Sequence, residues 1–291
     1  MNAKIPNFKI SELAIAIRTF IIVFAQQKSS GKTTKAINMA FKLILEGKKV
    51  AYVDLDSIRA AEDFAILCAE NKSERINHYT NMSLEYSKDQ KTKGLAARFS
   101  NKVIEITKEP VLKIHGSSLS SFSMKAVKER FHGYDFIIID LPANLYNNSD
   151  EIKPEISQLF IDSDLVIFPV KAEPQELKTA PILSRYVSSL KAFCESNKEI
   201  KTNVKFCTAM CFDITKYKGK NGTKQMADTI VEYNNVYGAT MPAFENPMVF
   251  RAIYPTQLGQ GMTIYSSDTT ETRSAQKEFN LVVQDIINQL N

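Results

Sequence analysis

The sequence has few cysteines, and their spacing argues against a metal or disulfide framework. Four are present in 291 residues, Cys68, Cys194, Cys207 and Cys211, and no two form a C-x-x-C pair. Cys207 and Cys211 lie in KFCTAMCF, a run typical of a buried strand. We therefore expect reduced thiols in a cytoplasmic protein.

Neither a long apolar run nor a strong excess of one charge is present. No stretch approaches the roughly 20 apolar residues of a membrane-spanning helix. The segment NFKISELAIAIRTF near the N-terminus is interrupted by charges and lacks a small-residue cleavage site, so a signal peptide is not expected. A net charge of +5 permits contact with nucleic acid without requiring it.

The sequence does contain four short, continuous apolar runs rich in β-branched residues. They are TFIIVFA (19–25), KVAYVDLD (49–56), YDFIIIDLP (134–142) and DLVIFPVK (164–171). Continuous rather than alternating hydrophobicity predicts strands buried on both faces, as in a parallel sheet covered by helices. Further strands are predicted at 109–116 and 203–212.

A helix is predicted between the first two strands. Its apolar face consists of Ile37, Ala40, Phe41, Ile44 and Leu45, with Gly47 as the stop. Strand, helix and strand form a βαβ unit, so the fold class is α/β, a doubly wound, mostly parallel sheet with helices on both faces.

The domain organisation is expected to be simple. Residues 1–18 are interpreted as an N-terminal leader with a short helix from Ser11, and residues 19–291 as a single domain. Two polar stretches, 70–102 and 213–241, are interpreted as surface excursions from it.

The stretch AQQKSSGKTT ends like a phosphate-binding loop. Gly31, Lys32 and Thr33 can fill its last three places, after a strand and before a helix. Such a loop curls backbone N–H groups around a phosphate at a helix N-terminus, with a lysine on the phosphates and a hydroxyl on Mg²⁺. The strand–loop–helix context makes a chance match improbable.

Three aspartates follow predicted strands. Asp54 and Asp56 end the second run, and Asp140 ends FIIID. Because the carboxyl ends of parallel strands meet where the loop lies, these carboxylates should converge there. One can hold the magnesium shell and another can orient the attacking water in phosphoryl transfer.

These motifs resemble those of the deviant Walker ATPases of the ParA/MinD group, and within it the ParA-like partition proteins. The family motif K-G-G-x-G-K-T-T is matched by QKSSGKTT, D-x-D by DLD, and the hydrophobic-D-x-P switch by IIIDLPAN with Pro142. A late segment resembles the family's R-x-x-Y…G pattern through Arg251, Tyr254 and Gly261, and favours ParA over MinD. The resemblance covers residues 19–290.

The resemblance implies a P-loop protein that binds ATP and Mg²⁺ and dimerises around two nucleotides. It implies slow hydrolysis, stimulated by a ParB-like or other partner. By motif position, catalysis falls to Lys32, Asp56 and Lys28, and magnesium binding to Thr33, Asp54 and Asp140. The implied nucleotide-binding residues are Lys28, Ser29, Ser30, Gly31, Lys32, Thr33 and Thr34.

The loop departs from the family before Gly31. The signature lysine, which reaches the partner's phosphates, falls at Gln27, and the next two glycines become Lys28 and Ser29. Three alternatives follow: Lys28 serves after a small rearrangement, Gln27 donates a weaker hydrogen bond, or the contact is absent. Serine can supply the N–H groups but adopts a positive φ less readily than glycine.

Two parts of the sequence are candidates for contact with larger partners. Non-specific DNA binding, which the resemblance implies, has as candidates Lys216, Lys218, Lys220, Lys224, Arg251 and Arg273, although ordinary surface charge explains them equally well. The last segment has an apolar stripe but lacks the basic residues that anionic lipid requires, so we expect a docked terminal helix and no membrane anchor.

The leading hypothesis is a cytoplasmic, nucleoid-associated ParA-like ATPase that dimerises on ATP and positions a plasmid or other cargo. The alternative is a nucleotide-binding scaffold or localisation adaptor with little ATPase activity. A metal-cluster enzyme of the same fold is disfavoured by the cysteine positions.

Overall fold

A parallel β-sheet forms the centre of the molecule. The computed structural model describes residues 18–25, 31–143, 145, 152–200 and 202–291. Within these residues seven strands form a sheet in the order β3-β2-β4-β1-β5-β6-β7, and every neighbouring pair runs parallel. The expected leader helix and the loop residues Lys28, Ser29 and Ser30 lie outside the described residues.

The six expected strands are present, and a seventh was missed. The strands are β1 (Phe20–Phe24), β2 (Val50–Asp54), β3 (Ile114–Gly116), β4 (Phe136–Asp140), β5 (Leu165–Lys171), β6 (Lys205–Asp213) and β7 (Met248–Phe250). The four central strands β2, β4, β1 and β5 are almost wholly buried, as their continuous hydrophobicity predicted. β7 has three residues, too few to form a recognisable apolar run.

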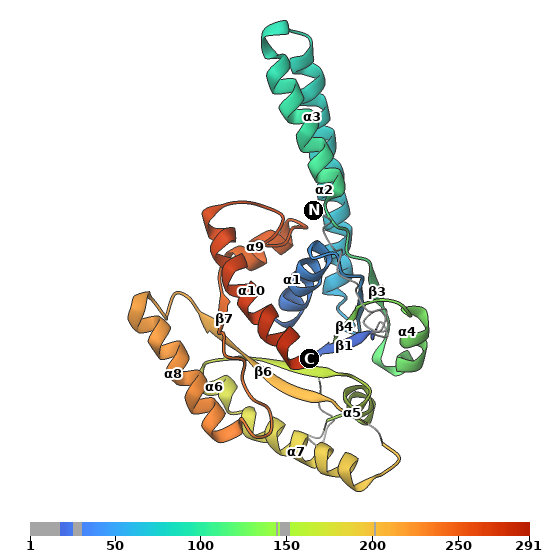
Figure 1. The fold of residues 1–291 in the computed structure, drawn as a ribbon, viewed down its shortest axis with the longest axis vertical. Coiled ribbons are helices and arrows are strands. Elements are labelled where there is room, and N and C mark those ends of the chain that lie inside the picture. Colours follow the sequence, from blue (N-terminus) through green and yellow to red (C-terminus); the bar gives the residue numbers. More distant parts are fainter. Residues whose placement is uncertain (1–17, 26–30, 144, 146–151, 201) are drawn as a thin grey trace, which may run out of the picture.

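Helices cover both faces of the sheet (Figure 1). One face carries α1 (Lys32–Leu45), α9 (Ile253–Gly259) and α10 (Thr270–Leu290), whose apolar residues share one buried cluster. The other face carries α4 (Met124–Arg130), α5 (Pro154–Ile161), α7 (Ala180–Ser196) and α8 (Gly219–Tyr237). The short α6 (Pro174–Leu177) follows β5. The doubly wound α/β fold is thereby confirmed.

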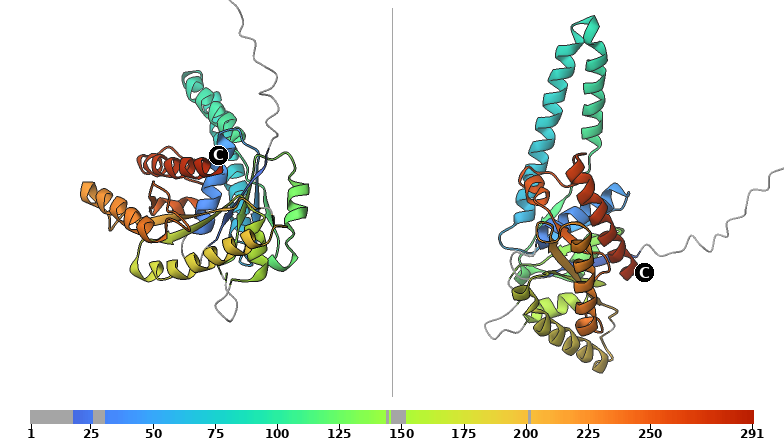
Figure 2. Two further views of the ribbon diagram at one scale, coloured as in Figure 1. Left: turned by 60° about the horizontal axis from the view of Figure 1, so that its bottom comes forward. Right: turned by 90° about the vertical axis from the view of Figure 1, so that its left-hand side faces the viewer.

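A long helical hairpin projects from this body (Figures 1 and 2). It consists of α2 (Ala60–Ser87), a short 3₁₀ turn (Gln90–Thr92) and α3 (Lys93–Lys108). The 28 residues of α2 span about 42 Å at the usual rise per residue. At its base Arg75 donates two hydrogen bonds to Glu109, at 2.8 and 2.7 Å. The polar stretch 70–102 is therefore almost entirely helical.

The C-terminal helix α10 docks on the core, as expected. Phe279, Val282, Val283 and Ile286 of its apolar stripe are buried, and Thr269 caps its first turn with a hydrogen bond from the Thr272 N–H. Across the described residues, no helix combines the length and the apolar character that crossing a membrane requires.

Candidate nucleotide-binding site

The site begins where β1 leads into α1. Gly31 adopts a left-handed conformation (φ 69°) directly before Lys32, and no side chain caps the first turn of α1. A Cβ on Gly31 would lie 3.1 Å from the Lys35 Nζ, so glycine fits both the backbone and the space. The uncapped helix N-terminus is a favourable place for an anion.

Lys32 is held by a buried carboxylate. Its Nζ lies 2.5 Å from Asp140 Oδ1, with the Lys32 side chain 5% and the Asp140 side chain 1% exposed. The Tyr52 hydroxyl donates to the other Asp140 oxygen at 3.1 Å. Burial, and then the charges of Asp140 and Asp54, raise the pKa of Tyr52, so its hydroxyl stays a donor. Asp140, itself held by Tyr52, thereby fixes the Lys32 amino group at the centre of the sheet edge.

Asp54 lies beside Asp140, because the two residues are register partners on β2 and β4. Its oxygens accept hydrogen bonds from the N–H groups of Asp56 (2.9 Å) and Ala61 (3.2 Å). Burial is the main cause that raises the pKa of Asp54 to about 6, and Asp140 adds to it. The two hydrogen bonds that Asp54 accepts hold the loop between β2 and α2 in place.

Asp56 lines an open crevice at the ends of β2, β3 and β4. The crevice encloses about 610 Å³, and its wall includes Asp56, Arg59, Ser117 and Pro142. Asp56 is half-buried, and its Oδ1 accepts a hydrogen bond from the Ile58 N–H at 3.1 Å. A carboxylate in such a place can contact a ligand in the crevice.

A second cavity lies at the ends of β5, β6 and β7. It measures about 160 Å³, and its wall combines the aromatic side chains of Phe212, Tyr217 and Phe250 with the charged residues Lys35, Lys171, Glu173, Asp213 and Lys216. Because β1 stands between β4 and β5, the start of α1 separates the polar crevice from this aromatic cavity.

The structure thus brings Gly31, Lys32, Asp54 and Asp140 to one edge, with Thr33 and Thr34 in the first turn of α1. It does not describe Lys28, Ser29 and Ser30. Sequence reasoning missed Tyr52, although the signal was available. Tyr52 lies two residues before Asp54, and alternate residues of a strand face the same side.

No group of three His, Cys, Asp or Glu side chains suited to a metal occurs within the described ranges. Magnesium takes one or two protein ligands and completes its shell with waters and substrate phosphates. Thr33, at the start of α1, offers a hydroxyl for that purpose.

The expected DNA-binding residues are partly engaged within the chain. Arg251 forms two hydrogen bonds with Glu278 (2.9 and 2.6 Å), Lys216 pairs with Glu173 at 2.6 Å, and Arg273 pairs with Asp268 at 2.6 Å. The further candidates Lys218, Lys220 and Lys224 are exposed on and just before α8.

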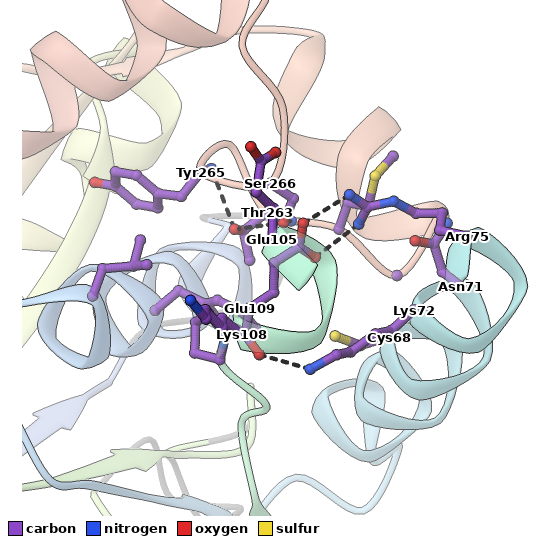
Figure 3. A pocket seen from close by; sticks show the side chains of 15 residues that line it. Cys68, Asn71, Lys72, Arg75, Glu105, Lys108, Glu109, Thr263, Tyr265 and Ser266 are labelled. Carbon is purple, nitrogen blue, oxygen red and sulfur yellow. Dashed lines mark hydrogen bonds and ion pairs between the residues drawn. The ribbon is translucent and has the colours of Figure 1, made fainter. Parts of the chain in front are cut away.

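A third cavity, of about 220 Å³, lies between α1, the hairpin base and the loop 261–266 (Figure 3). Lys72 donates from its wall to the carbonyl oxygens of Thr107 (3.0 Å) and Glu109 (2.8 Å), and Arg75 is paired with Glu109. These charges stabilise the hairpin base.

Comparison with known proteins places the chain in a family. Residues 19–202, more than half of the chain, match a family model described as an AAA domain. No curated protein matches the chain.

Solved structures match over nearly the whole chain. A plasmid partition protein from Borrelia burgdorferi B31, bound to AMPPNP, has a TM-score of 0.54 at 15% identity, covering 94% of this chain and 99% of its own. The MinC:MinD cell division complex of Aquifex aeolicus has a TM-score of 0.56 at 14% identity, with coverages of 93% and 96%. Cobyrinic acid a,c-diamide synthase from Mycobacterium smegmatis, with an ATP analogue and magnesium, has 0.53 at 13% identity, with coverages of 93% and 95%.

At these identities the likeness shows the fold. The chain belongs to this AAA domain family and has the fold of the ParA/MinD-type P-loop ATPases.

Proposed function

We propose that this protein is a cytoplasmic ParA-like ATPase, which binds ATP with Mg²⁺, dimerises on ATP and positions DNA or another cargo. The observation that carries the proposal is the buried Lys32–Asp140 pair beside Gly31 and the uncapped start of α1. A lysine, a glycine turn and a helix N-terminus at the carboxyl edge of a parallel sheet suit a phosphate.

Two cavities at the carboxyl edge of the sheet suit the two ends of a nucleoside triphosphate. The crevice at β2, β3 and β4 carries Asp56, whereas the cavity at β5, β6 and β7 has three aromatic side chains among charged ones. We place the phosphates over Gly31 and Lys32, the terminal phosphate toward Asp56 and the base toward Phe212 and Tyr217. This order follows the sheet, in which β1 lies between the two cavities.

In this proposal different residues bind the phosphates, hold the magnesium and position the attacking water. Lys32 and the N–H groups of the first turn, including Thr33 and Thr34, bind phosphate, with Lys28, Ser29 and Ser30 completing the loop. Thr33 and the Asp54–Asp140 pair hold or orient the shell of magnesium, which offsets the phosphate charge when bound. Asp56 positions the attacking water for phosphoryl transfer.

Dimerisation, a ParB-like or other activating partner and non-specific DNA binding are parts of the same proposal. Among the DNA candidates Lys218, Lys220 and Lys224 are the strongest, because Lys216, Arg251 and Arg273 form ion pairs within the chain. A non-hydrolysing scaffold remains the alternative function, motivated by the altered loop, in which Gln27 replaces the signature lysine and Lys28 and Ser29 replace two glycines.

Calorimetric titration with ATP and Mg²⁺ tests nucleotide binding. We expect wild type to bind and Lys32→Ala to lose binding, with Lys42→Ala as the control, since Lys42 lies on the same helix and pairs only with exposed Glu46 among the described contacts. Circular dichroism must show that Lys32→Ala is folded, because the variant leaves Asp140 buried and unpaired. Absence of ATP binding to wild type refutes the proposal.

Turnover distinguishes an ATPase from a scaffold. Phosphate release is measured with DNA and with the partner protein, for wild type and Asp56→Ala. We expect hydrolysis by wild type and its loss in the variant, with ATP binding retained. ATP binding without turnover under all these conditions favours the scaffold.

A further inference from the structure

Arg59 stands out by its backbone. Its φ of 54° makes it the single non-glycine residue with a positive φ among the residues that the structure describes. A left-handed conformation is costly for a residue with a Cβ, and such residues concentrate at functional sites. Arg59 directly precedes α2 and follows the loop that carries Asp56.

The Arg59 side chain is held by a neighbouring carboxylate. Its Nη1 donates to both oxygens of Glu62, at 2.9 and 2.8 Å. The pair lies against the backbone of Gly116, where a Cβ would come within 2.6 Å of the Arg59 Nη1 and 1.7 Å of Glu62 Oε1. Glycine at 116 therefore leaves the room that this ion pair occupies.

The pair faces the proposed terminal-phosphate end of the site. Arg59 and Asp56 both line the 610 Å³ crevice. Gly116 is the register partner of Asp54, which in turn is the register partner of Asp140. Glu62, and to a smaller extent Asp54, raise the pKa of the Arg59 guanidinium, which is consistent with its closeness to the strand-end carboxylates.

The charges of the site call for a further cation. Lys32 is already paired with Asp140, and Asp54 and Asp56 add negative charge at the same edge. A terminal phosphate that enters beside Asp56 is therefore stabilised by a cation on the crevice wall, in addition to the magnesium that would offset part of its charge. A guanidinium is well suited to this, because its fork of donors matches phosphate oxygens.

Resting on the proposed function, we propose that Arg59 is a phosphate-binding residue of the site, exchanging the Glu62 carboxylate for the terminal phosphate of a nucleoside triphosphate in the same chain. The exchange is inexpensive, since the Arg59 side chain is 51% exposed and exposed ion pairs contribute little stability. Arg59 thereby makes the site prefer ATP to ADP. Lys32 and the helix N-terminus, in contrast, contact phosphates that both nucleotides carry.

The test is the ratio of the ADP and ATP dissociation constants, measured by calorimetry with Mg²⁺. We expect Arg59→Ala to reduce this preference for ATP about tenfold to a hundredfold, the range for a lost charge-assisted contact. ADP affinity should stay near that of wild type. Arg59→Lys should retain part of the preference, since it keeps the charge and loses the fork.

Two further variants separate this role from a structural one. Arg59→Gly removes the backbone strain, so its melting temperature should rise by about 2–4 °C while the ATP preference is lost. Glu62→Gln weakens the hold on Arg59 and should keep or increase the preference for ATP. The control is Lys102→Gln, which removes an exposed i,i+3 partner of Glu105 on α3 and should leave the ratio unchanged.

An unchanged ratio in Arg59→Ala and Arg59→Gly overturns the inference and leaves Arg59 as a residue that only starts α2. That result is distinct from failure of the proposed function, in which wild type does not bind ATP at all. Equal loss of ATP and ADP affinity in Arg59→Ala also overturns it, because the contact would then not be with the terminal phosphate.

Discussion

Lys32 and Asp140, 108 residues apart in the chain, form a buried ion pair that joins the first residue of α1 to the last residue of β4. The pair fixes the Lys32 amino group at the sheet edge without the help of a ligand. Its charges are compensated by each other and by the Tyr52 hydroxyl. A phosphate that contacts Lys32 therefore meets a lysine whose position is already set, which lowers the ordering cost of binding.

Removing Lys32 and removing Asp140 should destabilise the protein by amounts that do not add, because each single variant leaves the other partner buried and uncompensated. Lys32→Met or Asp140→Asn leaves an uncompensated buried group, with an expected cost of about 3–5 kcal/mol for each single variant. The double variant should be less destabilised than the sum, with a coupling free energy of roughly 2 kcal/mol or more. Urea unfolding of the four proteins measures it.

The control for this cycle is the partly exposed Lys42–Glu46 pair at the end of the same helix, at 3.0 Å. Its coupling should be about 0.3–0.5 kcal/mol, as for ordinary i,i+4 pairs. Equal coupling in the two cycles would contradict a buried pair at the site.

Gly31 and Gly47 flank α1. Comparing their substitutions by alanine distinguishes an effect of backbone strain from an effect on ligand binding. Both have a positive φ, 69° and 81°, but only Gly31 has a neighbour within 4 Å of an added Cβ, the Lys35 Nζ. Either substitution by alanine should cost about 1 kcal/mol or more of unfolding free energy. Only Gly31→Ala should also weaken ATP binding, by tenfold or more, in the calorimetric titration.

The pH dependence of stability should contain a contribution from Asp54. Its pKa is raised to about 6 in the folded protein, whereas an unfolded aspartate titrates near ~3.9. Between these values the folded state binds more protons, so this contribution is fully present below pH ~4 and is lost as the pH rises through about 6. The loss is at most about 3 kcal/mol.

Asp54→Asn removes this titration. Urea unfolding at several pH values between 4.5 and 6.5 should show wild type losing stability relative to the variant as the pH rises. The variant also loses an acceptor for the Asp56 or Ala61 N–H, a cost that does not vary with pH. Parallel pH profiles for the two proteins would show that Asp54 titrates normally.

Sequence reasoning located the sheet and the centre of the site for the same physical reason. Strands buried on both faces leave continuous apolar runs, and their carboxyl ends must meet, so Asp54 and Asp140 could be placed beside Lys32 before the structure was known. The roles of these residues in catalysis and metal binding stay predictions.

What the sequence could not show depends on contacts between distant segments or on local backbone. The hairpin lacked a signal, since α2 buries few residues, among them Ala61 and Phe64, and is polar on most of its surface. The left-handed Arg59 is not visible from its residue type, because its conformation follows from the turn after Asp56.

Gly261, the glycine of the R-x-x-Y…G segment, packs closely against the backbone of α2. Its φ is 65°, and an added Cβ would lie 2.3 Å from the Leu67 carbonyl carbon and oxygen in α2. Because backbone atoms cannot give way as a flexible side chain can, Gly261→Ala must separate this loop from the hairpin base. We expect a loss of about 2–4 kcal/mol of unfolding free energy and faster hydrogen exchange in residues 61–75. Gly259→Ala is the matched control, since an added Cβ there meets nothing within 4 Å, and alanine in a helix should stabilise by up to about 1 kcal/mol. Equal effects of the two substitutions would show that the contact with Leu67 does not hold the hairpin to the body.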